Sequence, residues 1–203
     1  MRARPFPASP RSADPLRAYL AGPDIFLSEA VQLTERKKAI CARHGLIGIS
    51  PLDPLPGEPA DWAALPEWRR IALRNEAHIR SCDLLLANLT PFRGPSSDVG
   101  TVYEVAFMRS LNRPVFAYAT TASGFTRRTL DFAAGQGGVV AAPDGSLRDA
   151  QGMLIEQFGL FDNLMIEAGI LASGGKLIAE DIAVEDRWTD LSVFERCVQA
   201  SMA

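Results

Sequence analysis

A stretch that carries two carboxylates, residues 94–104, is the part of the sequence best suited to chemistry. Asp98 stands where a loop gives way to an expected helix, and Glu104 falls within the first two turns of that helix. Backbone N–H groups and the positive end of the helix dipole are expected to hold Glu104 ionised. An ionised carboxylate fixed near the end of a strand can attack a sugar carbon. Thr101 and Glu104 also fit a capping box, so a structural role stays open on this pattern alone.

Two other segments place small or polar residues at expected strand and helix ends. Tyr19 lies in a short apolar run that Gly22 and Pro23 terminate. A glycine after a strand lets a ligand approach the backbone closely, although a plain tight turn gives the same pattern. Asn163 precedes an apolar helical stretch, where it could serve a ligand or simply cap the helix.

Short apolar runs alternate with segments of helical spacing along the chain. The expected strands are 17–21, 46–49, 83–89 and 114–118, and the expected helices are 26–43, 67–81, 99–111 and 191–200. Ser28 or Asp24 could cap the first helix. Such alternation predicts an α/β fold with a parallel sheet covered by helices on both faces. Ligands of such sheets bind at the carboxyl ends of the strands, which here precede 22–26, 51–53 and 90–104.

The pattern weakens after residue 119. Residues 135–146 are expected to form a loop or a small hairpin, and residues 151–172 to be largely helical. Residues 1–16 contain three arginines and several prolines without an apolar core, so a flexible leader is expected there and not a secretion signal. Residues 17–203 show no internal repeat and are expected to form one domain.

Charge and cysteine content argue against several classes of function. The chain has 203 residues, with 21 Lys and Arg against 24 Asp and Glu, and its formal charge of −3 disfavours bulk binding to nucleic acid. No apolar run approaches the roughly 20 residues that span a bilayer, so a cytoplasmic protein is expected. Three widely spaced cysteines and two histidines form no metal-binding pattern, so we expect no metal.

Taken together, these segments resemble the nucleoside 2-deoxyribosyltransferase family over about residues 19–170. The anchors are 19–23, 81–83, 87–89, 92–94, 98–101 with Glu104, and 163–166. Each anchor is short, but their order and spacing are specific. The resemblance implies a flavodoxin-like or Rossmann-like, doubly wound sheet of about five parallel strands. It also implies that no metal and no organic cofactor are needed.

The resemblance also implies roles for individual residues. Glu104 matches the family's nucleophile, which forms a glycosyl ester that an incoming base resolves, with retention at the anomeric carbon. Asp98 and Tyr19 match residues that hold the sugar hydroxyls and orient the nucleophile. Asn163 matches a residue that reaches the site of a neighbouring subunit, so a homo-oligomer with shared sites is expected.

The implied reaction exchanges the base of a 2'-deoxynucleoside, as in nucleotide salvage. The donor is a 2'-deoxynucleoside, and the acceptor is a free purine or pyrimidine base. Gly22 and Pro23 belong to the first anchor and are expected to line the substrate site. A 2-deoxy sugar suits this chemistry, because no electron-withdrawing hydroxyl destabilises the cation-like transition state beside the anomeric carbon.

One position departs from the family pattern. Some relatives carry an aspartate on the second helix that helps to protonate the leaving base, and the matching residue here is Asn75. A neutral amide can orient a base by hydrogen bonding but cannot supply a proton. Glu76, Asp53 or water could take that role. The sequence leaves open the general acid and the preference for purines or pyrimidines.

Three other functions are compatible with the sequence. A hydrolase of 2'-deoxynucleoside 5'-monophosphates would need donors around the phosphate, which Ser96 and Ser97 could supply, but the carboxylate of Asp98 would repel a phosphate. A hydrolase of free nucleosides would use the same residues with water as acceptor. A non-catalytic nucleoside-binding module is the third alternative, although it would have no need of Glu104.

Overall fold

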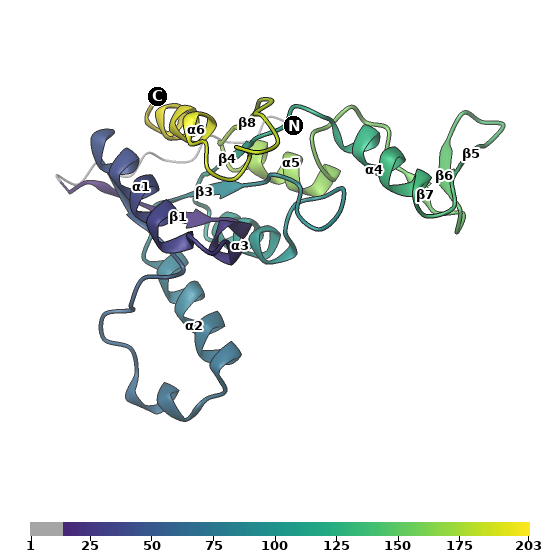
Figure 1. The fold of residues 1–203 in the computed structure, drawn as a ribbon. Coiled ribbons are helices and arrows are strands. Elements are labelled where there is room, and N and C mark those ends of the chain that lie inside the picture. The colour runs from purple at the N-terminus through teal and green to yellow at the C-terminus, as the bar shows by residue number, and fades with distance from the viewer. Residues whose placement is uncertain (1–13) are drawn as a thin grey trace.

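Five parallel strands form a central sheet in the spatial order β2-β1-β3-β4-β8 (Figure 1). They are β1 (Leu16–Ala21), β2 (Leu46–Ile49), β3 (Leu84–Asn88), β4 (Val115–Ala119) and β8 (Leu177–Ala179). This is the strand order of flavodoxin-like folds, and it confirms the predicted fold class. The computed structural model describes residues 14–203, so most of the expected leader lies outside the described residues. Leu16, expected in that leader, already belongs to β1.

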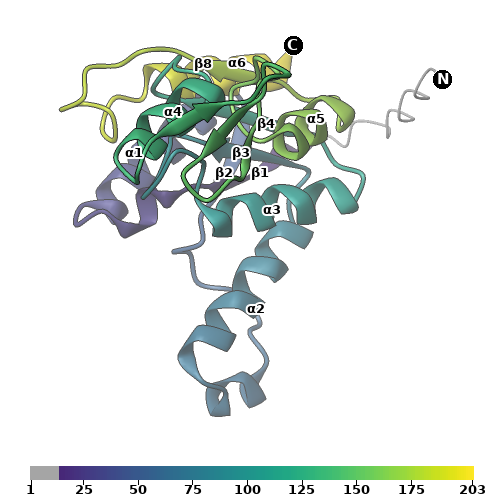
Figure 2. The same ribbon diagram turned by 90° about the vertical axis from the view of Figure 1, so that its right-hand side faces the viewer.

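Helices cover both faces of the sheet and form a separate hydrophobic core on each. They are α1 (Ala30–Arg43), α2 (Glu67–Arg80), α3 (Val99–Ser110), α5 (Leu164–Ala172) and α6 (Ser192–Met202). Tyr19 and Leu85 point to the core shared with α2, α3 and α5, whereas Leu20 and Leu86 point to the core shared with α1 and α6. Figure 2 shows α2 extending away from the sheet beneath α3. Because β3 is covered on both faces, its consecutive residues are all apolar from Leu84 to Ala87.

A group of elements that we term the lobe, residues 125–155, projects from the sheet at the right of Figure 1. It comprises α4 (Phe125–Ala134) and three antiparallel strands, β5 (Val139–Ala141), β6 (Leu147–Asp149) and β7 (Leu154–Ile155). The hairpin of β5 and β6 confirms the expectation for 135–146. The helix expected over 151–172 is wrong in its first half. Gly152 and Gly159 adopt φ values of 80° and 70°, which no helix contains, and α5 begins only after Asn163.

The first helix starts later than its apolar spacing indicates. Residues Pro23–Phe26 form a short 3-10 helix, η1, and α1 begins after Glu29, whose side chain makes no capping bond. Neither Ser28 nor Asp24 caps this helix, so that expectation is wrong. A second 3-10 helix, η2 (Ala60–Ala64), lies in the loop between β2 and α2. Within residues 14–203, no helix is long and apolar enough to cross a membrane.

The turn after β1 packs directly against the end of β3, which generates a prediction. A Cβ atom added to Gly22 would lie 2.7 Å from the Cβ of Asn88. Gly22→Ala should therefore lower the free energy of unfolding by roughly 1–3 kcal/mol, measured by urea denaturation. Gly94→Ala is the matched control, because no atom lies within 4 Å of a Cβ built there. Equal stability of the two variants would contradict this account of the turn.

Candidate active site

Glu104 and Tyr19 form the centre of the candidate site. Glu104 lies in the second turn of α3, and Tyr19 lies in β1 with its side chain on the α3 face of the sheet. The Tyr19 hydroxyl donates a hydrogen bond of 2.6 Å to Oε1 of Glu104. Tyr19 is fully buried, and burial raises the pKa of its phenol well above the usual value, so the hydroxyl retains the proton that it donates. The sheet thus fixes the orientation of the Glu104 carboxylate.

The pKa of Glu104 is raised to about 7, because burial raises it more than the hydrogen bond from Tyr19 lowers it. The negative charge of Asp98 raises it as well. The expectation that the start of the helix holds Glu104 ionised is therefore wrong. The field of a helix dipole fades within the first turn, and Glu104 lies in the second. Near neutral pH this carboxyl group exists in both its acid and its ionised form.

Asp98 is the N-cap of α3. Its Oδ2 accepts hydrogen bonds from the backbone N–H of Thr101 at 2.8 Å and from the Thr101 hydroxyl at 3.0 Å. The alternative in which Thr101 and Glu104 form a capping box is therefore wrong, since the cap lies three residues earlier. Within the described residues Oδ1 of Asp98 accepts no hydrogen bond, so it is available to a ligand.

Asn75 joins the site from α2. Its Nδ2 lies 3.5 Å from Oε1 of Glu104, a long hydrogen bond to the same oxygen that Tyr19 contacts. Its Oδ1 is buried and has no donor among residues 14–203. A buried acceptor without a donor carries a desolvation penalty, which a ligand N–H or O–H group would relieve. Asn75 also lines the cleft described next, although its Oδ1 is itself buried.

A cleft of about 840 Å³ lies between the turn after β1, the loop after β2 and α2. Phe26 forms an apolar wall and stacks on Phe92 with 5.5 Å between ring centroids. The opposite wall carries an ion pair between Glu58 and Arg74. Such a space, with one flat apolar wall and a few polar groups, suits a small planar molecule. Asn75 lines this cleft and also contacts Glu104, which is not itself among the lining residues.

The two side chains considered as alternative general acids are engaged elsewhere. Asp53 lines the cleft, but its Oδ1 pairs with Lys38 at 2.5 Å and its Oδ2 accepts from the backbone N–H of Ser50 at 2.9 Å. Glu76 accepts a hydrogen bond of 2.7 Å from the hydroxyl of Tyr103 on the exposed side of α2. Both carboxylates thus accept hydrogen bonds from other residues of the protein, and neither is directed at the leaving base as a proton donor.

The segment around Gly22 and Pro23 is held by a network whose lysine was not singled out from the sequence. Asn88, at the end of β3, donates to Oδ1 of the buried Asp24, and Lys37 forms an ion pair with Oδ2 of the same carboxylate. Asn88 occupies the space beside Gly22 in which a ligand was expected to approach. Lys37 could have been recognised from its place on the apolar face of α1, four residues after Leu33.

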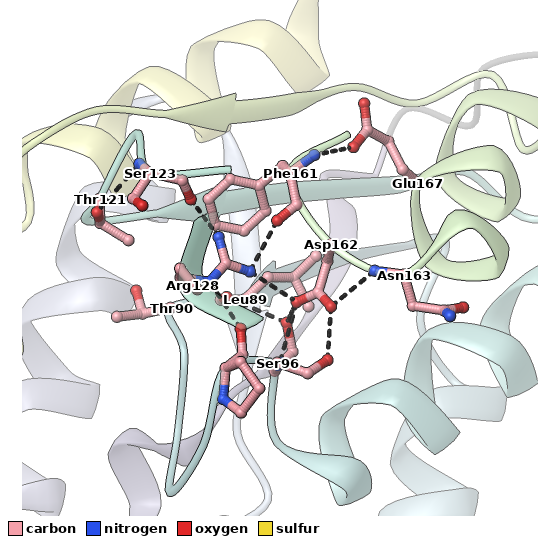
Figure 3. Close-up of polar contacts among 12 residues, drawn as sticks. Leu89, Thr90, Ser96, Thr121, Ser123, Arg128, Phe161, Asp162, Asn163 and Glu167 are labelled. Carbon is pink, nitrogen blue, oxygen red and sulfur yellow. Dashed lines mark hydrogen bonds and ion pairs between the residues drawn. The ribbon is translucent and has the colours of Figure 1, made fainter. Parts of the chain in front are cut away.

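Asn163 forms no hydrogen bond with Glu104 within the described residues. It caps α5, as one interpretation of the sequence predicted. Its Oδ1 accepts from the backbone N–H of Met165 at 3.0 Å, and its Nδ2 donates to Glu156 at 2.6 Å. Its side chain points away from the neighbouring carboxylate of Asp162 (Figure 3). A contact of Asn163 with the site of a second subunit stays a prediction.

Comparison with known proteins places this arrangement in a family. A sequence model described as nucleoside 2-deoxyribosyltransferase matches residues 18–165. The chain belongs to the nucleoside 2-deoxyribosyltransferase family. An uncharacterized protein of Schizosaccharomyces pombe is 27% identical over 175 residues, covering 83% of this chain and 82% of that protein.

A solved structure shares the fold of this family member. The 2-desoxiribosyltransferase from Leishmania mexicana superposes with a TM-score of 0.58 at 22% identity, covering 91% of this chain and 98% of that chain. At that identity the likeness establishes the fold alone. The residues matched by the nucleoside 2-deoxyribosyltransferase model include the whole candidate site, from Tyr19 through Asn75 and Asp98 to Glu104.

The raised pKa of Glu104 generates a prediction about stability. Between its ordinary value of 4.5 and its value of about 7, the folded state binds more protons than the unfolded state, so stability falls as the pH rises through this window. Glu104→Gln removes that loss, because its amide is neutral at every pH. The melting temperature of Glu104→Gln relative to wild type should therefore be higher at pH 8 than at pH 5.

The control is Glu29→Gln, an exposed glutamate whose side chain makes no capping bond. Its melting temperature should differ from wild type by the same amount at both pH values. If Glu104→Gln behaves like this control, the carboxyl of Glu104 is not buried as described.

Proposed function

We propose that this protein transfers the 2-deoxyribosyl group of a 2'-deoxynucleoside to a second purine or pyrimidine base, with Glu104 as the nucleophile. One observation carries the proposal. A carboxylate with a pKa of about 7 is bonded to the buried Tyr19 and to Asn75, beside a cleft of about 840 Å³ that can hold a nucleoside. Membership in the nucleoside 2-deoxyribosyltransferase family supports the same reaction.

The reaction consists of two displacements at the anomeric carbon. In the first, an oxygen of ionised Glu104 attacks C1′, the bond from C1′ to the base nitrogen breaks, and its electron pair leaves with the base, which takes a proton from water. In the second, a nitrogen of the incoming base attacks C1′, the ester bond breaks, and the carboxylate of Glu104 is regenerated. The incoming base loses its proton to water. Two inversions give retention of configuration.

Tyr19 and Asn75 both orient the carboxylate of Glu104. Both contact Oε1 of Glu104, which leaves Oε2 for attack on the sugar. The unpaired Oδ1 of Asn75 would accept an N–H group of the bound base. Because an amide has no acidic proton to give, Asn75 would orient the base while water protonates it. Oδ1 of Asp98 would accept a hydrogen bond from a sugar hydroxyl.

The alternative of a 5'-monophosphate hydrolase loses the residues that favoured it. The hydroxyls of Ser96 and Ser97 both donate to Asp162, at 2.5 and 2.6 Å, so neither is free to donate to a phosphate. A hydrolase of free nucleosides differs from a transferase only in using water as the acceptor, and the assay below separates the two. A pure binding module is distinguished by binding nucleosides without turning them over.

A homo-oligomer with shared active sites is part of the proposal. Val99 on α3 and Met165 and Leu171 on α5 are exposed, and Asn163 stands at the start of α5. Exposed apolar side chains are a feature of surfaces that bind a second protein. In an assembly, a second copy of the chain would cover these residues and bring Asn163 to its site.

The reaction is tested by incubating the purified protein with thymidine or 2'-deoxyinosine and free adenine and separating the products by chromatography. We expect 2'-deoxyadenosine, and we expect Glu104→Gln to lower kcat by at least about 10³-fold. Release of free base without 2'-deoxyadenosine would instead identify a nucleoside hydrolase. Binding of nucleosides without any turnover would leave the non-catalytic module.

The pH dependence of exchange tests the role of Tyr19. Activity requires ionised Glu104, so kcat/KM should rise with pH through an ionisation near 7. The hydrogen bond from Tyr19 lowers that pKa, so Tyr19→Phe should move the rise to higher pH. Tyr103→Phe serves as control, because Tyr103 lies on α3 next to Glu104 but its hydroxyl donates to Glu76. An unshifted profile for Tyr19→Phe would argue against its role.

A further inference from the structure

A buried ion pair between Arg128 and Asp162 joins the lobe to the segment before α5 (Figure 3). Asp162 also bonds to the residues that precede α3, the helix that carries Glu104. The side chain of Arg128 is 9% exposed and that of Asp162 is 1% exposed, with 3.5 Å between Nη2 and Oδ2. Arg128 belongs to α4, and Asp162 precedes α5. Neither residue bonds to Glu104, Tyr19 or Asn75, and the reaction described above does not use them.

Arg128 holds three backbone segments at once. Its guanidinium donates to the carbonyl oxygens of Pro95 at 2.6 Å, of Phe161 at 2.7 Å and of Ser123. These carbonyls follow β3, precede α5 and follow β4, respectively. The planar guanidinium suits this task, because its five N–H groups point in fixed directions, whereas an ammonium group is a point charge.

Asp162 accepts hydrogen bonds from the residues that precede α3. Its Oδ2 accepts from the backbone N–H of Ser97 at 3.0 Å and from the Ser97 hydroxyl at 2.6 Å. Its Oδ1 accepts from the Ser96 hydroxyl at 2.5 Å and from the backbone N–H of Asn163 at 2.8 Å. Ser97 directly precedes Asp98, the N-cap of α3. One carboxylate therefore fixes the residues that start both α3 and α5.

We propose that Arg128 and Asp162 are positioning residues for catalysis. They fix the position of the start of α3 relative to the sheet, and hence the position of Glu104 relative to Tyr19. This inference rests on the proposed function. The pair acts through the backbone at Ser97 and Asp98, and its loss would let the start of α3 move. A displacement of about 1 Å at a reacting group can lower a rate by about a hundredfold. Because Arg128 lies on α4, the lobe acts on the site through this side chain.

The test compares Arg128→Met with Arg127→Met. Arg127 is the adjacent residue on α4, but its side chain is 74% exposed and pairs with the exposed Asp131. We expect Arg128→Met to lower kcat roughly ten- to a hundredfold with a smaller change in KM. We also expect it to move the ionisation seen in kcat/KM above 7, as the contact between Tyr19 and Glu104 lengthens. Arg127→Met should match wild type in all three quantities.

Two further variants separate positioning from general stability. Arg128→Lys keeps the charge opposite Asp162 but loses the fixed directions of the guanidinium, so it should restore only part of kcat. Ser96→Ala removes one hydrogen bond to Asp162 but keeps its ion pair with Arg128, so it provides a mild variant if Arg128→Met fails to fold. Ser96→Ala should shift kcat and the ionisation in the same directions by smaller amounts.

Amide hydrogen exchange, followed by NMR on wild type and variants, tests the proposal without any assay of activity. The amides of Ser97 and Asn163 donate to Asp162, so both should exchange faster in Arg128→Met and not in Arg127→Met. Unchanged exchange would overturn the proposal even if the protein proves to have another activity. Faster exchange with wild-type kcat and an unshifted ionisation would overturn the positioning role. Failure of base exchange in wild type would count against the proposed function alone.

Discussion

The rest of this structure depends on one constraint: several carboxylates are buried near the carboxyl ends of the strands, away from water. Asp24 and Asp162 are buried there, and each is compensated by a cation, Lys37 or Arg128. Glu104 has only the neutral partners Tyr19 and Asn75, and within the described residues no cation pairs with it. A buried charge without a counter-charge is unfavourable, so Asp24 and Asp162 stay compensated by cations while the pKa of Glu104 rises to about 7.

The sequence predicted the sheet because its strands are covered on both faces. Consecutive apolar residues from Leu84 to Ala87 are typical of a strand with no solvent-facing side, and the same logic identified β1, β2 and β4. It did not identify β8, an edge strand of three residues, or α4, whose capping position is occupied by Gly124 without a side-chain bond. A short element contains too few residues to show a hydrophobic periodicity that differs clearly from the surrounding loops.

The placement of Asp98 and Glu104 at the start of α3 was predictable from the sequence, but the electrostatics of Glu104 was not. Asp98 and Glu104 were recognised because a loop, a cap and a helix are local features of the chain. The pKa of Glu104 was misjudged, because burial by residues distant in the sequence outweighs the local helix dipole. The pairing of Arg128 with Asp162 joins residues 34 positions apart and leaves no local pattern. Interactions between distant segments emerge only when the fold brings them together.

The self-contained pairing of β5, β6 and β7 has a consequence for how this chain can vary. These strands bond to one another and not to the five-stranded sheet. Their length and sequence can therefore diverge among relatives, or be exchanged by grafting, without disturbing the register of the parallel strands. This tolerance does not extend to α4, because the guanidinium of Arg128 bonds to backbone carbonyls outside the lobe. The lobe is in this sense a module whose variable strands are separate from its attachment through α4, where Phe125, Thr126 and Arg128 bond to residues outside it.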